Sequence, residues 1–203
     1  MKFAGTTMAM CCAACLILSA NGQGIILDQC NDQTPWSLLA QWSLKAGDPV
    51  GQEFVPTLGG LDFVDAPFFE REGTASPATI QVLIREGTIS GPVVGSSRQV
   101  TFYGSGIQRF DFPSTVPLIP GQTYVMHLFH EAPTDYLVGA DPTMSYLNGQ
   151  MIRSGVPFDG YDLWFREGQV VVPEPGCVAL CSLGAVLLTV RFWRRRGAKI
   201  ASA

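Results

Sequence analysis

The stretch ATIQVLIREG, residues 78–87, decides the fold class, because apolar and polar side chains alternate along it with a period of two. Ile80, Val82 and Ile84 share one face of an extended chain, and the residues between them are polar except for Leu83. This alternation is typical of a β-strand with one buried face, whereas a helix repeats its apolar residues every 3.6 positions. The stretch therefore predicts a strand that ends at Gly87.

The same period extends outward along the chain. TYVMHLFHE, residues 123–131, is apolar on both faces, which predicts a central strand. RFDFP, residues 109–113, also alternates, and further strand candidates are residues 25–27, 52–55, 61–64, 100–103 and 163–165. Three Arg-Glu-Gly triplets, at residues 71–73, 85–87 and 166–168, are interpreted as strand exits into glycine turns.

Glycine and proline interrupt the middle of the chain at short intervals, and no stretch between them holds ten residues of helical periodicity. Only residues 35–44 are a helix candidate, and a strand is an equal alternative there. Short strands at this spacing predict an all-β fold, a β-sandwich that spans residues 23–172.

Both ends of the chain are apolar segments with their own patterns. Residues 1–22 hold one lysine, an apolar run and small residues near the end, which predicts a secretory signal peptide, with an N-terminal membrane anchor as the alternative. Residues 176–192 are 17 in number and would form about 25 Å of helix, enough for a single transmembrane helix. The positive-inside rule would keep the arginines that follow in the cytoplasm.

The C-terminal segment, residues 173–203, resembles the PEP-CTERM sorting signal of Gram-negative bacteria. The resemblance rests on a Pro-Glu-Pro triplet, an apolar helix directly after it and a terminal arginine cluster; the matching positions are Pro173, Glu174, Pro175, Arg194, Arg195 and Arg196. It implies recognition by an exosortase-type membrane protease and a place in the cell envelope or extracellular matrix. The expected export partners are the Sec translocon and signal peptidase. An ordinary tail anchor is the alternative.

The net charge of −4 hides two unlike parts. All 17 acidic residues lie between Asp28 and Glu174, where seven basic residues leave a net charge of −10, while five basic residues follow Glu174. A protein that binds nucleic acid needs a basic face, so we exclude nucleic acid as a partner of this acidic body.

Six cysteines would suggest disulfides, but five of them lie within residues 1–22 and 176–192. Cys30 is alone in the body, so we expect no disulfide within the body. A lone cysteine without an activating neighbour is typically a small buried apolar group, and we expect Cys30 to be buried.

Four pieces of the body resemble extracellular β-sandwich segments that often precede such sorting signals and are similar in layout to jelly-roll carbohydrate-binding domains. The pieces are GLDFVDAPFF (60–69), IREGTISGPVVGSS (84–97), FDFPSTVPLIPGQTYV (110–125) and DLWFREG (162–168). The resemblance implies a jelly-roll-like fold and association with polysaccharide. Its motifs are patterns of strands and turns and contain no set of functional residues.

Catalytic patterns are sparse. His127 and His130 are three apart on an expected strand, which predicts opposite faces, one side chain packed and one solvated. No Gly-x-Ser-x-Gly elbow, P-loop or His-Glu-x-x-His motif accompanies them, and spacing alone does not place two carboxylates as a glycosidase pair. We expect no enzymatic activity and no cofactor, with structural calcium at loop carboxylates such as Asp141 and Asp159 left open.

Aromatic residues in or near loops are the candidate ligand contacts, because a flat ring offers its face to the C–H surface of a sugar. The candidates are Tyr136, Tyr146, Tyr161 and Trp164, with Asp159 and Asp162 beside them. For Trp36, Trp42 and Trp164 a packing role is the favoured alternative. The predicted function is a non-catalytic, envelope-sorted protein associated with polysaccharide. The alternatives are a matrix or adhesion protein that binds other proteins, and a glycan hydrolase.

Overall fold

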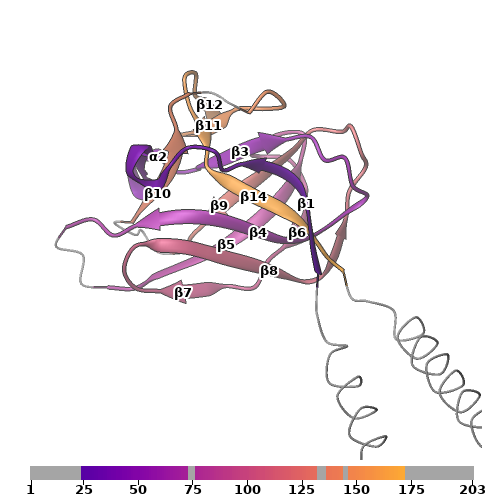
Figure 1. The fold of residues 1–203 in the computed structure, drawn as a ribbon, viewed down its shortest axis with the longest axis horizontal. Coiled ribbons are helices and arrows are strands. Elements are labelled where there is room, and N and C mark those ends of the chain that lie inside the picture. Colours follow the sequence, from indigo (N-terminus) through magenta and orange to yellow (C-terminus); the bar gives the residue numbers. More distant parts are fainter. Residues whose placement is uncertain (1–23, 73–75, 132–135, 144–145, 172–203) are drawn as a thin grey trace, which may run out of the picture. The chain divides into compact units, whose positions relative to one another are not determined.

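The computed structural model describes residues 24–72, 76–131, 136–143 and 146–171, and Ile25–Val170 form one compact unit (Figure 1). The predicted signal peptide, the PEP triplet, the predicted transmembrane helix and the arginine cluster lie outside the described residues. Among the described residues, no helix is long and apolar enough to cross a membrane.

The described residues form an all-β fold of two antiparallel sheets, which confirms the predicted fold class. The first sheet contains β1 (Gly24–Asn31), β2 (Ala40–Ser43), β4 (Gly60–Phe69), β8 (Gly106–Pro117), β10 (Leu137–Asp141), β13 (Asp162–Leu163) and β14 (Phe165–Val171). The second contains β3 (Gly51–Phe54), β5 (Ala78–Glu86), β6 (Val93–Ser96), β7 (Val100–Phe102), β9 (Tyr124–Phe129), β11 (Met151–Arg153) and β12 (Val156–Pro157). The ambiguous residues 35–44 divide between a 3-10 turn, η1 (Trp36–Leu38), strand β2 and the start of α2 (Leu44–Gly47).

Strand β4 organises the first sheet. Most of its length pairs with β8, from Gly60 opposite Pro117 to Phe68 opposite Gly106, with a shift of register between Leu61 and Phe63. Its other side pairs first with β14 and then with β10. Strand β1 lies at the edge beside β14, as Figure 1 shows, and a Cβ placed on Gly24 would lie 3.8 Å from the Cβ of Val171.

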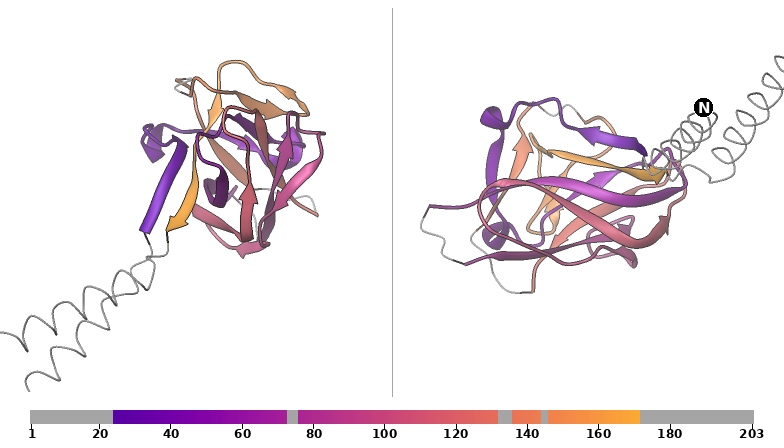
Figure 2. Two further views of the ribbon diagram at one scale, coloured as in Figure 1. Left: turned by 90° about the vertical axis from the view of Figure 1, so that its right-hand side faces the viewer. Right: turned by 60° about the horizontal axis from the view of Figure 1, so that its bottom comes forward.

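Strand β9 lies between β3 and β5 in the second sheet, which confirms the prediction of a central strand. The alternation that predicted β5 is also confirmed, because Ile80, Val82 and Ile84 are at most 1% exposed while Thr79 is exposed. Figure 2 shows the strands of the domain from two further sides. Buried side chains from both sheets form the main core. Its largest fully buried members include Phe54, Phe68, Phe110, Phe165, Met126 and Leu128.

The interpretation of the Arg-Glu-Gly triplets holds for one triplet and fails for another. Gly87 follows β5 with a φ of 70°, as a glycine turn requires. Gly168 lies inside β14 instead, where a Cβ would come within 2.0 Å of the carbonyl oxygen of Ile26. That glycine is needed because β1 passes too close for a side chain. Gly73, in the remaining triplet at residues 71–73, is outside the described residues.

Candidate functional site

Two of the predicted ligand residues, Tyr136 and Tyr146, are buried in the core. Tyr136 is 0% exposed, and its hydroxyl accepts a hydrogen bond from the amide of Gly104 at 3.1 Å. Tyr146 is 8% exposed; its hydroxyl donates to Oε1 of Gln29 at 3.2 Å and accepts from the amide of Val55 at 3.3 Å. Neither ring face is open to a ligand, so we leave both tyrosines out of the candidate site.

Trp164 and Asp162 are also buried. Trp164 packs against Leu39 in a small apolar cluster apart from the main core. The Asp162 carboxylate accepts hydrogen bonds from Nε2 of Gln52 at 3.2 Å and from the amide of Tyr146 at 3.3 Å. Burial raises the pKa of Asp162, and the bond from Gln52 opposes that rise. These contacts give both residues structural roles.

Tyr161 and Asp159 lie nearer the surface, on the loop between β12 and β13. Tyr161 joins Trp42 and Phe158 in a group of half-buried rings that we call the aromatic cluster. The ring centroids of Phe158 and Tyr161 are 5.5 Å apart and the rings are stacked at 14°, while Trp42 meets both edge-on at 5.0 and 5.1 Å. Asp159 is exposed between the two stacked residues in the sequence.

Arg153, the last residue of β11, lies over the same rings. Its guanidinium carbon is 4.6 Å from the ring centroid of Trp42 and 5.4 Å from that of Phe158, distances typical of cation–π contacts. The Nε atom of Arg153 is enclosed and has no hydrogen-bond partner in the part of the chain that the structure describes. The indole Nε1 of Trp42 is likewise enclosed and unpartnered.

A tight hairpin positions Arg153. Ser154 and Gly155 connect β11 to β12 with φ angles of 53° and 78°, as in a type I′ turn. The amide of Ser154 donates to the carbonyl of Gly47 at 2.6 Å, which holds the hairpin to the end of α2. A Cβ on Gly47 would lie 3.0 Å from Cγ of Arg153, so the arginine packs directly on this glycine. The backbone of the hairpin therefore fixes the point from which the Arg153 side chain extends.

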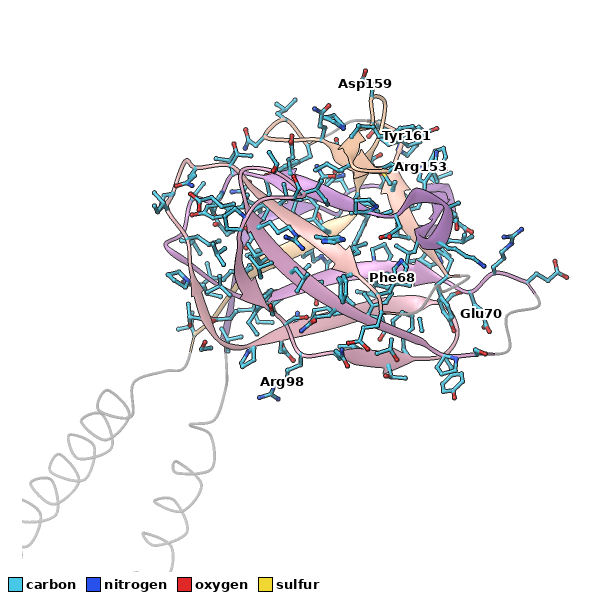
Figure 3. The ribbon with its side chains drawn as sticks, turned by 180° about the vertical axis from the view of Figure 1, so that it is seen from behind. Phe68, Glu70, Arg98, Arg153, Asp159 and Tyr161 are labelled. Atoms are coloured by element: carbon cyan, nitrogen blue, oxygen red, sulfur yellow. The ribbon has the colours of Figure 1, made fainter. Side chains whose placement is uncertain are left out.

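The candidate site consists of Trp42, Arg153, Phe158, Asp159 and Tyr161. Figure 3 shows Arg153, Asp159 and Tyr161 together at one end of the domain, with Arg98 at the opposite end. Sequence reasoning identified Tyr161 and Asp159, favoured packing for Trp42 and missed Arg153 and Phe158. The available signal was a Ser-Gly turn at residues 154–155, followed after two residues by a Phe-Asp-Gly-Tyr loop.

Both histidines are packed, so the expectation of one packed and one solvated side chain is wrong. Nε of Arg85 donates to Nδ1 of His127 at 3.2 Å, which places the histidine proton on Nε2. Burial, and secondly the charge of Arg85, lower the pKa of His127 to about 4. The His130 side chain is 6% exposed and lies 3.7 Å from Asp48. Strand β9 ends at Phe129, so its alternation does not extend to His130.

Glu167 is a buried carboxyl group that makes no hydrogen bond. Glu167 is 0% exposed, and neither of its carboxyl oxygens has a hydrogen-bond partner among the described residues. Burial raises the pKa of Glu167 to about 8, and the nearby carboxylate of Asp28 adds to the rise; the amide of Gln29 opposes it without reaching hydrogen-bond geometry. Because Glu167 is fully enclosed, it cannot touch a ligand, and its charge bears on stability.

Cys30 is exposed, so the prediction that it is buried is wrong. It lies on β1 between Gln29 and Asn31, which are buried, and the period of two turns its side chain outward. Partial burial and the adjacent carboxylate of Asp32 raise the pKa of the thiol.

The calcium alternative rested on Asp141 and Asp159. The Asp141 carboxylate accepts hydrogen bonds from Thr34 at 2.7 Å and from the amide of Thr143 at 2.9 Å. Within residues 24–171, leaving aside the short gaps, no group of three or more His, Cys, Asp or Glu side chains is arranged to hold a metal ion.

No protein-family model matches this chain, and no curated protein matches its sequence.

Proposed function

We propose that this chain is an exported, non-catalytic protein of the Gram-negative cell envelope, and that its body binds surface or extracellular polysaccharide at the candidate site. The observation that carries the proposal is the aromatic cluster of Trp42, Phe158 and Tyr161, with a cation and a carboxylate beside it. We further propose that the two sheets have a jelly-roll-like arrangement, as the resemblance of the four sequence pieces implies.

A sugar ring presents apolar C–H groups on its faces and hydroxyls at its edge. Half-buried aromatic rings offer the matching apolar surface, and a few polar groups beside them can orient the hydroxyls. In the candidate site Arg153 supplies donors and Asp159 supplies acceptors. The rings of the cluster hold one another in place, so binding would order few side chains, which favours affinity.

Binding to a panel of purified polysaccharides tests this function, with the full chain kept soluble in mild detergent. We expect Tyr161→Ala and Phe158→Ala to weaken the interaction at least tenfold, about 1.4 kcal/mol. The matched control is Tyr103→Ala, because Tyr103 is 73% exposed and outside the cluster. Retention on cell-surface protein and on no glycan would support the adhesion alternative instead. Glycan turnover that a carboxylate variant abolishes would support a hydrolase.

The sorting part of the proposal rests on the sequence resemblance. In this proposal signal peptidase removes residues 1–22 after Sec export, and an exosortase-type protease recognises Pro173, Glu174 and Pro175 while residues 176–192 hold the chain in the inner membrane. Mass spectrometry of the C-terminal peptide from cells tests it. We expect a terminus near Pro175, whereas a protein that still ends at Ala203 would indicate a plain tail anchor.

A further inference from the structure

Arg153 differs from the other arginines that pack on the sheets, because it has no acceptor. It forms no hydrogen bond or ion pair with any other residue in the part of the chain that the structure describes. Three other arginines each donate to an acceptor: Arg85 to Gly91 at 2.8 Å, Arg109 to Asp65 at 2.8 Å and Arg166 to Asp32 at 2.7 Å. Among the described residues, the guanidinium at the candidate site is therefore a charge without a paired carboxylate.

A guanidinium that is half-buried and lacks acceptors has lost part of its hydration. Its cation–π contacts with Trp42 and Phe158 compensate for some of that loss, but they leave its N–H donors unused. Nε of Arg153 and the indole N–H of Trp42 are enclosed, so the donors that a ligand can reach are the terminal Nη groups of Arg153. A planar group with two oxygens and a negative charge would satisfy these donors best, because it matches the fork of a guanidinium.

We propose that the candidate site prefers polysaccharides that carry carboxylates, with the uronate carboxylate paired to Arg153 and the sugar ring resting on the aromatic cluster. This inference rests on the proposed function of the site. The stacked sugar would exclude water from the ion pair, and the pair would be stronger than an exposed one for that reason.

The charge of the whole body works against a polyanion, since residues 28–174 carry a net charge of −10. A general attraction to a basic surface therefore cannot produce the preference, which must come from the short-range contact with Arg153. At 0.15 M salt the screening length is about 8 Å, so the repulsion from distant carboxylates is damped while a direct contact persists. The preference should consequently survive at physiological ionic strength.

The test compares uronate hexamers with their own methyl esters, in which each carboxylate has lost its charge and gained a methyl group. Hexamers of galacturonate, glucuronate and mannuronate are titrated into the full chain in mild non-ionic detergent at 0.15 M salt. We expect at least one acid to bind tenfold or more tightly than its ester. Arg153→Gln should abolish the difference between the acid and ester affinities, while Arg98→Gln, at an exposed arginine at the other end of the domain, should leave that difference as it is in the parent.

Further variants separate a lost ion pair from a disturbed cluster. Arg153→Met keeps an apolar stem on the rings and should behave like Arg153→Gln, whereas Arg153→Lys should retain part of the preference. Acid and ester binding equally well, with both weakened by Tyr161→Ala, would overturn the charge preference and leave the proposed function standing. A preference that persists in Arg153→Gln would also overturn it. No binding of any hexamer or of any polysaccharide would overturn the proposed function itself.

Discussion

Replacing Glu167 tests the most unusual electrostatic feature of the fold. The carboxyl group is fully buried without a hydrogen bond, and its pKa rises from an ordinary value of 4.5 to about 8. A raised carboxyl pKa means that the folded state holds a proton that the unfolded state has released between these two values. Folding stability is therefore intact below pH 4.5 and falls as the pH rises toward 8.

The size of the effect follows from the pKa difference. Each unit corresponds to about 1.4 kcal/mol, so a group that moves from 4.5 to about 8 lowers the free energy of unfolding by about 3 kcal/mol at pH 7. Glu167→Gln and Glu167→Met remove the titration. For both variants, the free energy of unfolding minus that of the parent should rise by about 3 kcal/mol from pH 5 to pH 8. This rise is expected whatever the difference is at pH 5.

Urea unfolding of residues 23–172 at pH 5, 6, 7 and 8 measures this gain, and thermal melting should show it as an increase of roughly 6 to 12 °C at pH 8. Glu70→Gln is the matched control, because it makes the same substitution at an exposed position. A stability difference for Glu167→Gln that stays constant from pH 5 to pH 8 would refute the reasoning. It would mean that Glu167 is hydrated or paired in solution.

Three further predictions concern other parts of the fold. His127 has a lowered pKa of about 4, so protonation favours the unfolded state as the pH falls from 6.5; His127→Asn should abolish about 3 kcal/mol of acid destabilisation, measured by urea unfolding at pH 4 and pH 7. Gly168→Ala should cost about 2 kcal/mol or more and expose the amides of β1 to hydrogen exchange, while Gly106→Ala, with only a side-chain nitrogen at 3.4 Å, should be mild. Arg109→Met leaves the Asp65 carboxylate without its two 2.8 Å hydrogen bonds and should cost about 2 kcal/mol; a double-mutant cycle with Asp65→Asn measures the coupling.

Local periodicity predicted the strands whose alternation is complete. Strand β5 was found because each inward residue between Ala78 and Ile84 is apolar, so the pattern on one face is visible without any partner strand. Strand β10 was missed because Leu137–Asp141 are only five residues and end in a buried aspartate. That aspartate is tolerated through Thr34, which lies 107 positions away in sequence and has no local signature.

The candidate site likewise combines residues that the sequence pointed to with residues that only the fold reveals. Its residues come from β2, from the end of β11 and from the loop after β12, and tertiary packing alone brings them together. Residue type pointed to Tyr161 and equally to Tyr136, although Tyr136 is enclosed by the core. Composition cannot separate the two, because the burial of a ring depends on which strand lies across it. Arg153 was missed because an arginine at the end of a strand is ordinarily solvated.

Gly24 and Val171 are neighbours, so the two ends of the described body lie close together. Since β1 and β14 are neighbours, a linker of a few glycines could join the two ends, and new termini could be opened at a surface turn such as Gly121, where φ is 81°. A circular permutant of this kind should keep the β-sandwich while separating the domain from both of its flanking segments. It would allow the site to be attached to other proteins from a different side.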